Sequence, residues 1–359
     1  MGEWQGIQVY YYEENKDGLI LDCVRPLFDR LAPRVEQLFF TRHWLRGPHL
    51  RLSFHADEAL RAGLIVPETE RAVTRYLAEH PSTAEFDERE LLATHRAVAV
   101  QEQEPGPLEP LHPDNSLRYA PHDRRIQVLG STAAAELLEG FYTATNAMVF
   151  AALERVRAGE SRLTLALDLM MATAHAMWPG IDRGFISYRS HAEGFIVRAA
   201  DPAARRASCD EMYRSQAAAL RERLVAVLDT LDNGTDSVPF VTDWVTVLRG
   251  FRERAEPLIA SGDLTFAAAE RGYAQRDWDP AMLEHSTFHR LLQGDGGRME
   301  QLQRDPAFLG FRFALNYLYL HLNRIGIRPV ERFLLCHLIA GAVEDHYRIS
   351  ANDFVATGR

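Results

Sequence analysis

The sequence changes character near residue 130, and this change constrains the fold more than any single motif does. Segments with strand-like composition occur before that point, as in WQGIQVYYYE at residues 4–13 and in the paired segments at 35–54. From Ser131 onward the apolar residues follow helical spacing almost to the end. Such segregation predicts an α+β fold, because a parallel sheet would need strands and helices to alternate. We expect a small antiparallel sheet with a hairpin near the N-terminus, packed against a large, mainly helical remainder.

The segment RHWLRGPHLRLSF, residues 42–54, predicts the hairpin. Gly47 and Pro48 mark a turn between two strand-like segments. In the second strand the side chains alternate, since successive residues point to opposite faces. Leu50, Leu52 and Phe54 therefore share one face, and the opposite face carries a polar set: His49, Arg51, Ser53 and His55. The polar face is either only solvated or part of a binding site.

Other segments extend this prediction along the chain. Helical spacing occurs at 17–31 and 67–79, Ser82 and Glu85 have the spacing of a capping box, and Ile126 to Leu129 resembles a short strand. The proline-rich and acidic residues 101–116 indicate a loop or inserted flap. Six helical segments follow, at 131–156, 161–178, 201–231, 238–260, 305–325 and 328–347, and several of them begin with a Ser or Asp cap or with a proline at the first helical position. We expect one domain over 1–359, with a β-rich part at about 1–130 and a helical part at about 131–350.

Composition excludes several classes of protein. The chain has 359 residues and a net charge of -10, which argues against nucleic acid as a general partner. Three distant cysteines give neither a disulfide framework nor a zinc-ribbon spacing. The N-terminus lacks the features of a signal peptide, and no apolar run is long enough to span a membrane. We therefore expect a cytoplasmic protein with no membrane or nucleic-acid partner.

Familiar catalytic signatures are absent from the sequence. It contains no glycine-rich phosphate loop, no G-x-G-x-x-G after a strand, no H-E-x-x-H and no G-x-S-x-G. His285 and His289 lie four residues apart and could share a helix face, but no third ligand is evident nearby. We favour a surface or packing role for these two histidines and expect no metal site.

Two polar clusters within otherwise apolar helical segments are better candidates. In GFISYRSHAEGF a helix would bring Ser187, Tyr188 and His191 together, at i, i+1 and i+4. In ALNYLYLHLNRIGI, Tyr317, His321 and Arg324 share a helix face, with Asn316, Tyr319 and Asn323 beside it. Polar side chains in apolar helices either bond to one another or line a cavity. Both interpretations, a buried hydrogen-bond network and a functional site, remain open at this point.

Five short segments occur in an order that resembles a known family. They are WQGIQVYYY, RHWLRGPHLRLSF, RYAPHDRR, SYRSHAEGF and HLNRIGI. Together they resemble the C-terminal elimination domain of lantibiotic dehydratases and its free-standing relatives in thiopeptide biosynthesis. The resemblance covers nearly the whole chain. Each motif is weak alone, and their order makes the resemblance fairly specific.

The sequence departs from the eliminases of this family, which remove glutamate from glutamylated Ser or Thr. Their hairpin strand reads approximately H-I-R-L-R-F, and here Arg51 matches the first arginine while Ser53 replaces the second. In their segment Y-x-P-E-x-x-R-Y-G-G the acid is replaced here by His122, and Ile126-Gln127 replaces Tyr-Gly. A lost arginine removes a charge-assisted donor to the expelled glutamate, worth about 1.5–3 kcal/mol.

These departures make the chain similar to the thiopeptide pyridine synthases. Such enzymes join two dehydroalanines of a linear precursor peptide by a formal aza-[4+2] cycloaddition. They then form the pyridine by losing water and the leader peptide. The resemblance implies a modified precursor peptide, leader plus core, as the partner, and it implies no cofactor. Exposed sheet edges would also permit a homodimer.

The chemistry implied by this resemblance needs neutral donors and acid/base groups. We predict that these are supplied by Tyr188, His191 and His321, with Ser187 and Tyr317 as secondary candidates. Arg51, with Arg42 and Arg46, would orient peptide carbonyls or an acidic leader segment. The predicted substrate-binding set also includes Arg125, Arg189, Asn323 and Arg324.

Two alternatives remain at this point. One is a stand-alone glutamate eliminase that forms dehydroalanine beside a separate glutamylating protein. The other is a non-catalytic module that binds leader peptides and recruits other enzymes.

Overall fold

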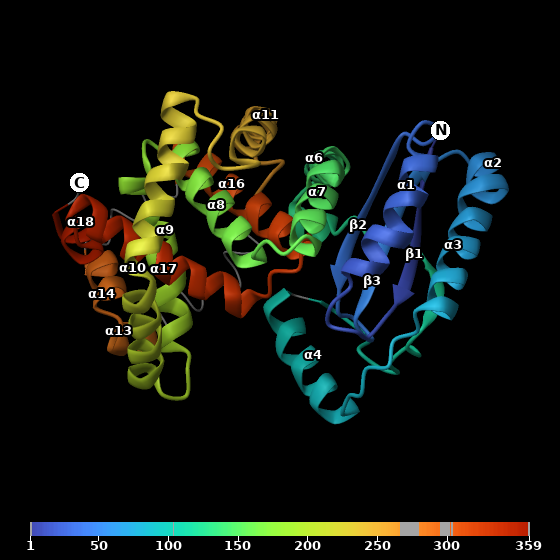
Figure 1. Ribbon diagram of the computed structural model, residues 1–359, viewed down its shortest axis with the longest axis horizontal. Helices are drawn as coiled ribbons and strands as arrows, with labels where there is room; N and C mark the ends of the chain where they lie inside the picture. The colour runs from blue at the N-terminus through green and yellow to red at the C-terminus, as the bar shows by residue number, and fades with distance from the viewer. Residues whose placement is uncertain (1, 103, 266–279, 295–301, 303, 358–359) are drawn as a thin grey trace. The chain divides into compact units, whose positions relative to one another are not determined.

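The computed structural model describes residues 2–102, 104–265, 280–294, 302 and 304–357 (Figure 1). The chain divides into two compact units. Unit 1 comprises residues 1–160 and 323–326, and unit 2 comprises 161–322 and 327–359. The predicted α+β class is confirmed, because a four-stranded antiparallel sheet lies in the N-terminal part and helices dominate the rest.

The sheet of unit 1 has the strand order β2-β3-β1-β4. Its strands are β1 (Glu3–Tyr10), β2 (Gln37–His43), β3 (His49–Ala56) and β4 (Ser116–Ala120), and all neighbours are antiparallel. The predicted hairpin is therefore confirmed as β2–β3, with His43 opposite His49. β2 and β4 are the two edges of the sheet.

The turn of this hairpin depends on backbone conformations with positive φ. Gly47 has a φ of +123°, which a side chain would disfavour, and Arg46 before it has a φ of 60°. The Gly47 N–H donates a 3.0 Å hydrogen bond to the Trp44 carbonyl. The turn places Leu50 and Leu52 on the face of the sheet that carries the core, where both are fully buried.

Helices cover the apolar face of the sheet. Phe28, on α1, makes an edge contact with Phe54 at 5.8 Å between ring centroids, and α1 lies across the strands in Figure 1. The helical segments of unit 1 are η1 (Leu19–Val24), α1 (Arg25–Leu31), α2 (Glu58–Leu60), η2 (Arg61–Ile65), α3 (Val66–Glu79), α4 (Glu88–Glu102), α5 (Ile126–Leu129), α6 (Thr132–Ala144) and α7 (Asn146–Arg157).

Three local predictions in unit 1 are wrong. The capping box at Ser82 does not form, because the backbone N–H of Ser82 donates to Asn115 and α4 begins six residues later, at Glu88. Asp87 caps that helix instead, accepting from the backbone N–H groups of Arg89 and Glu90. Acidic residues with capping spacing occurred at both places, and only tertiary contacts selected one of them.

The strand-like segment Ile126 to Leu129 is a helical turn, α5. It follows Arg125, whose backbone is left-handed with a φ of 49°. The fourth strand lies earlier, at Ser116–Ala120, within and after the segment that we read as a loop. The long helix expected at 131–156 is also divided, since α6 ends before Thr145 and α7 begins after it.

All the regular secondary structure among the described residues of unit 2 is helical. Its helices are α8 (Arg162–Ala176), α9 (Ile181–Val197), α10 (Pro202–Asn233), α11 (Val241–Ser261), α13 (Pro280–His285), α14 (Thr287–Gly294), α16 (Pro306–Arg324, whose last two residues belong to unit 1), α17 (Pro329–Tyr347) and α18 (Ala351–Thr357). Ser161 and Asp201 cap α8 and α10 as their sequences predict. Among the described residues, no helix combines the length and apolar character required to cross a membrane.

Candidate functional site

A histidine and a tyrosine from two helices of unit 2 form the strongest candidate site. His191 lies on α9 and Tyr319 on α16, and His191 Nδ1 is 2.7 Å from the Tyr319 hydroxyl. On its other side the same hydroxyl is 3.7 Å from the Cys336 sulfur on α17. His191 is half-buried, and its Nε2 makes no hydrogen bond to any described residue. That nitrogen is therefore the free end of a chain of three polar groups.

Burial keeps all three groups of this chain neutral. It lowers the pKa of His191 to about 3, an effect that the positive charges of Arg332 and Arg312 reinforce. Burial also raises the pKa of Cys336 to about 12 and that of Tyr319 well above its usual value. A thiol that donates to the phenol, which in turn donates to Nδ1, gives the thiol and phenol protons an acceptor. In this arrangement the neutral imidazole carries its proton on Nε2.

Arg332, at the start of α17, lies over this pair. Its guanidinium carbon is 4.2 Å from the centre of the Tyr319 ring, within the range of a cation–π contact. Its Nε is buried and has no hydrogen-bond partner among the described residues. A buried cationic donor beside a neutral imidazole can polarise a carbonyl oxygen without supplying a nucleophile.

Tyr188 lies on the same helix as His191 and connects that helix to α8. The prediction that it lies on a helix with His191 is confirmed, since both belong to α9. Its hydroxyl is fully buried and donates a 2.6 Å hydrogen bond to the Met170 carbonyl on α8. Burial raises its pKa well above the usual value. These contacts favour a positioning role for Tyr188, and its chemical role stays a prediction.

The other predicted residues of α9 face different surroundings. Ser187 lines a cavity of about 130 Å³ together with Trp178, Phe308 and Phe311. Arg189 forms an ion pair with Glu344 on α17 and lies 3.5 Å from His337 Nδ1. Ser187 therefore borders a small, mostly apolar pocket, whereas the charge of Arg189 is already paired within unit 2.

Tyr317 and His321 lie on the opposite side of α16 from Tyr319. The Tyr317 ring packs against Phe313 at 4.0 Å between centroids, and the His321 ring packs against Trp244 of α11 at 4.8 Å. Residues two apart on a helix are separated by about 200°, so Tyr319 must face another way. Both side chains are buried. The described contacts thus do not gather His191 and His321 into one cluster.

The two histidines considered for a metal lie in different helices. His285 ends α13 and is exposed, whereas His289 is buried in α14. His289 Nδ1 lies 3.0 Å from the Ser286 hydroxyl, and its Nε2 lies 3.2 Å from the Ser190 hydroxyl. Ser286 in turn donates to the buried carboxylate of Glu193. His289 therefore has the packing role that the sequence favoured for this pair.

The polar face of the hairpin in unit 1 is largely buried. His49 is fully buried, and its Nδ1 donates to the Gly47 carbonyl at 2.8 Å, so its Nε2 can accept from Arg51 Nε at 3.3 Å. Burial, reinforced by the charge of Arg51, lowers the pKa of His49 to about 3. Burial also lowers the pKa of Arg51. Of the two interpretations of this face, simple solvation is wrong.

Ser53 and His122, the two residues that depart from the eliminase pattern, lie next to each other on this face. The Ser53 hydroxyl lies 3.1 Å from His122 Nδ1, and His122 Nε2 lies 3.0 Å from the carboxylate of Glu139. Arg124 also binds Glu139 through two 2.8 Å hydrogen bonds. Burial would raise the pKa of Glu139, but the bonds from His122 and Arg124 hold it below the usual value. Ser53 and His122 thus replace the family's arginine and acid as a contacting pair.

Arg324 is built into the core of unit 1. It is fully buried and donates to the Phe40 carbonyl at 2.9 Å, the Tyr142 carbonyl at 3.0 Å and the Thr145 hydroxyl at 2.8 Å, and it also bonds to Asn146. Burial lowers its pKa to about 9. All these acceptors are neutral, so Arg324 holds unit 1 together by hydrogen bonds.

The remaining predicted substrate-binding residues of unit 1 have varied surroundings. Arg42 binds the Arg324 carbonyl at 3.0 Å and Asp17 at 3.1 Å. The other two bind loop carbonyls, Arg46 that of Pro110 at 2.9 Å and Arg125 that of Glu102 at 2.6 Å. Asn323 is exposed, and its carbonyl accepts from Gly326 at the end of α16.

Sequence reasoning missed the importance of Tyr319 and Arg332. Tyr319 was noted only as a neighbour of the face that carries Tyr317 and His321, and Arg332 was not noted at all. A usable signal was present, because Arg332 and Cys336 are four residues apart on a helix and so share a face. The partner of that face could not be identified without the packing of α9, α16 and α17.

Comparisons with known proteins agree on the family. The family model described as lantibiotic biosynthesis dehydratase, C-terminal, matches residues 4–343. The solved structure of TbtD, a pyridine synthase from thiomuracin biosynthesis, is 35% identical with a TM-score of 0.78, and the match covers 97% of this chain and 100% of that chain. No curated protein sequence matches this chain.

Two more distant structures share the fold. TsrL is 22% identical with a TM-score of 0.76, over 100% of this chain and 99% of that chain. MibB, a tRNA-dependent lantibiotic dehydratase from Microbispora sp. 107891, is 15% identical with a TM-score of 0.53, over 97% of this chain and 28% of that chain. With the family match over most of its length and the similarity to TbtD, this chain belongs to the lantibiotic biosynthesis dehydratase C-terminal family.

Proposed function

We propose that this protein is a pyridine synthase of thiopeptide biosynthesis. Its substrate is a linear precursor peptide, leader plus core, that carries two dehydroalanines. One amide adopts its iminol form, and the resulting 2-azadiene adds through its two terminal carbons to the second alkene, forming two C–C bonds. Loss of water and then of the leader peptide as a carboxamide makes the ring aromatic. The product is a pyridine-centred macrocycle.

The observation that carries this proposal is the similarity to TbtD along the whole of both chains. A match of 35% identity with 97% and 100% coverage leaves no large segment of either protein unmatched. The shared region therefore includes both units rather than a single binding module.

The His191–Tyr319 pair suits the chemistry of this reaction. A cycloaddition needs positioned alkenes and a donor that stabilises the iminol form, and it needs no strong nucleophile. The Nε2 proton of His191 can bind the oxygen of the reacting amide. Arg332 is the second donor in reach of the same region, and Tyr319 holds the tautomer of His191. Ser187, Tyr188, Tyr317 and His321 then belong to the supporting structure of unit 2.

The glutamate eliminase is the second candidate. An eliminase must stabilise an expelled glutamate anion, for which its hairpin supplies two arginines. Here Ser53 and His122 contact each other in place of the second arginine and the acid. Only Arg51 remains of the arginine pair, and we therefore rank elimination below cyclisation. A non-catalytic leader-binding module is the third candidate.

A single assay separates the three candidates. Purified protein is incubated with two synthetic substrates, a precursor carrying two dehydroalanines and a glutamylated precursor, and the products are analysed by mass spectrometry. We expect the first substrate to give a macrocycle and a free leader carboxamide, and the second to be unchanged. Loss of glutamate from the second would support the eliminase. Binding of both without conversion would support the module.

The Tyr319→Phe variant tests the assigned site. It keeps the ring beneath Arg332 and removes only the hydroxyl that binds His191. We expect kcat to fall by about 10²-fold, the lower end of the usual effect of a positioned proton donor. KM should change little. Ser350→Ala, far along the chain, is a matched control for loss of a hydroxyl. Unchanged kcat in Tyr319→Phe would remove Tyr319 and His191 from the site.

A further inference from the structure

The outer edge of β4 has unused backbone hydrogen-bonding groups. In an antiparallel sheet the N–H and C=O of one residue point to the same neighbouring strand, and the direction alternates along the strand. The Tyr11 N–H donates to the Pro48 carbonyl, so odd-numbered residues of β1 face β3 and even-numbered residues face β4. The register then directs Arg118 of β4 toward Gln8 of β1. Leu117 and Tyr119 must therefore direct their backbone groups outward.

No described residue satisfies these outward groups. β4 is the last strand in the order β2-β3-β1-β4, and the backbone N–H and C=O of Leu117 and Tyr119 make no hydrogen bond to the described part of the chain. The opposite edge differs. There the Leu38 and Phe40 carbonyls of β2 accept hydrogen bonds from Asn146 at 2.7 Å and from Arg324 at 2.9 Å.

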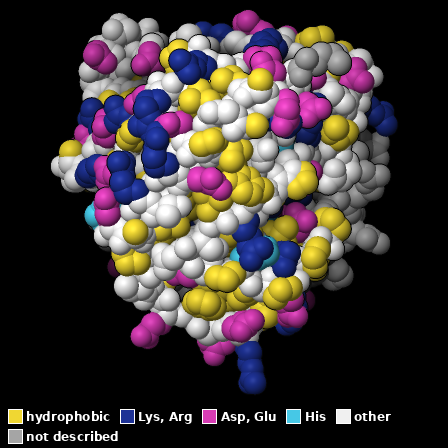
Figure 2. Space-filling model, turned by 90° about the vertical axis from the view of Figure 1, so that its right-hand side faces the viewer, with side chains coloured by type: hydrophobic (Ala, Val, Ile, Leu, Met, Phe, Trp, Pro, Cys, Tyr) yellow, Lys and Arg dark blue, Asp and Glu magenta, His cyan; other side chains and the backbone are white. Residues whose placement is uncertain are grey.

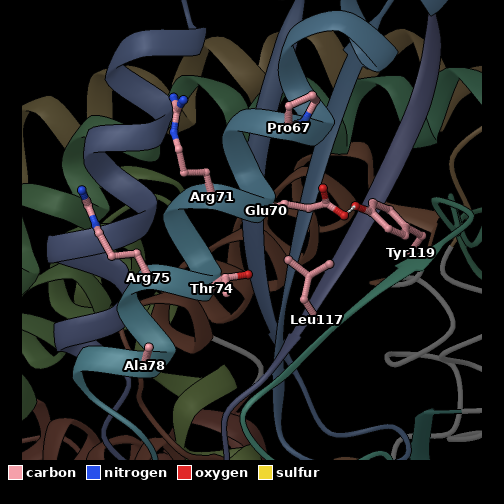
Figure 3. A pocket seen from close by; sticks show the side chains of 8 residues that line it. All are labelled: Pro67, Glu70, Arg71, Thr74, Arg75, Ala78, Leu117 and Tyr119. Carbon is pink, nitrogen blue, oxygen red and sulfur yellow. Dashed lines mark hydrogen bonds between the residues drawn. The ribbon is translucent and has the colours of Figure 1, made fainter.

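A groove of about 870 Å³ lies beside the open edge, between β4 and α3 (Figure 3). Leu117 and Tyr119 line it from the strand, because they share the face of the sheet with Val9 and Ile7. The Tyr119 hydroxyl binds Glu70 of α3 and so connects the strand and helix sides of the groove. From the helix, the lining residues are Pro67, Glu70, Arg71, Thr74, Arg75 and Ala78. This exposed stripe follows the helical period of three to four residues.

The charge around this edge is positive. Arg75 on α3 and Arg118 on β4 are both exposed, and neither pairs with a carboxylate among the described residues. The nearest acid of the groove, Glu70, is already bonded to Tyr119. Figure 2, which views the side where α2 and α3 lie in Figure 1, shows arginines, with acidic side chains among them, beside a band of hydrophobic side chains. A chain with a net charge of -10 thus presents unpaired cations here.

We infer that an extended, acidic segment of the precursor's leader peptide binds at this edge as a fifth strand of the sheet. This inference rests on the proposed function, which makes a precursor peptide the substrate. The backbone of the segment bonds to the outward N–H and C=O groups of Leu117 and Tyr119. Its side chains alternate between the groove over α3 and the opposite face of the sheet.

The same geometry specifies which leader residues matter. Side chains directed into the groove meet Leu117, Thr74 and Tyr119, which suits small or apolar residues. Acidic side chains reach Arg75 across the helix, or Arg118 from the other face. Every second backbone N–H of the leader segment bonds to β4, and the N–H groups between them point to solvent.

The test measures binding of the fluorescein-labelled, unmodified leader peptide by fluorescence anisotropy. Leu117→Pro removes an outward N–H and leaves the bonds to β1 in place, because proline is tolerated where an edge N–H faces solvent. We expect its Kd to rise at least tenfold. Leu117→Ala keeps the N–H and should raise Kd less than threefold. Arg75→Glu should raise Kd about tenfold at low salt and less at high salt.

N-methylation of the leader peptide gives a second, independent readout. A methyl group at alternate backbone nitrogens should abolish binding, and a methyl group at the intervening nitrogens should not. A melting temperature within a few degrees of wild type shows that each variant is folded. Unchanged affinity of folded Leu117→Pro, or methylation effects without this alternation, overturns the inference.

A second copy of the chain is the competing occupant of the edge. If sedimentation shows a wild-type dimer that Leu117→Pro dissociates while leader affinity stays the same, the edge is a self-interface and the inference is wrong. Failure of the proposed function looks different. In that case the wild-type protein binds the leader but converts no dehydroalanine substrate.

Discussion

The two edges of the sheet in unit 1 differ in how their outward-facing backbone groups are hydrogen-bonded. At β2, the side chains of Asn146 and Arg324 bond to the outward carbonyls of Leu38 and Phe40, so these acceptors of the edge are satisfied by the protein itself. At β4, the outward groups of Leu117 and Tyr119 bond to no described residue and border a groove. An open edge promotes unwanted pairing, and proteins usually block it. That one edge is sealed and the other is left open indicates a use for the open one.

The difference also concerns where charge is placed. The closed edge holds a fully buried arginine surrounded by neutral acceptors, a costly arrangement that requires every donor to be satisfied. The open edge carries exposed arginines that cost little to keep in water. The first arrangement serves stability, and the second remains free to bind.

The Arg324→Ala variant should break the closed edge and have the largest effect. It leaves the buried carbonyls of Phe40 and Tyr142 without donors and opens a cavity in the core. We expect the free energy of unfolding to fall by about 3–5 kcal/mol, since several buried hydrogen bonds are lost together. Urea denaturation measures this loss. Arg324→Lys should recover part of it, and a loss below about 1 kcal/mol in Arg324→Ala would contradict the assigned role.

Acid should weaken the row of side chains that joins the two edges. His49 lies in this row, opposite His43 and Tyr10. Its pKa is about 3 in the folded protein against about 6.5 unfolded. Between these values the unfolded chain binds a proton that the folded chain does not, so stability falls as pH drops from about 6.5 toward 3.

The slope attributable to His49 is at most about 1.4 kcal/mol per pH unit. Urea denaturation at several pH values measures it, and His49→Gln should flatten the profile over this window. An identical profile in that variant would show that His49 does not control the acid sensitivity.

Asn146→Ala should loosen the closed edge at one point. It removes the donor to the Leu38 carbonyl and the acceptor of one Arg324 bond. We expect a loss of about 1–3 kcal/mol, as for other unsatisfied buried groups. In the double variant with Arg324→Ala the losses should not add, because the two residues share a bond. Simple additivity would mean that they act separately.

Arg118→Glu at the open edge should have the smallest effect on stability. Arg118 is exposed and pairs with no described residue, so the free energy of unfolding should change by less than about 0.5 kcal/mol. Affinity for the leader peptide should nevertheless fall. A large loss of stability would show that this edge, too, is part of the structural framework.

Much of the fold could be predicted from local pattern. The alternation in residues 49–55 identified a half-polar strand, and the turn at Gly47 gave its partner. Ser161, Asp201 and the N1 prolines marked helix starts correctly. The failures at Ser82 and at 126–129 have a common cause. Each local signal was compatible with two conformations, and distant residues selected one, as Asn115 did for Ser82.

The candidate site was less predictable than the fold. His191 was identified because a polar residue in an apolar helix needs a partner, but the sequence did not show which residue of another helix that partner is. The helical period placed Tyr317, His321 and Arg324 on one face, yet it could not tell which neighbour that face contacts. In the folded protein the His321 ring packs against Trp244, and Tyr319 forms the hydrogen bond with His191.

The sequence by itself determined the class of fold, the hairpin and the family, because these depend on periodicity, turn residues and the order of motifs along the chain. Only the tertiary structure decided which polar groups meet. It joined Ser53 to His122 and His191 to Tyr319, and it closed one edge of the sheet while leaving the other open. The reason is physical. Contacts between residues more than 60 positions apart are set by packing, and local sequence patterns carry no information about which distant residues pack together.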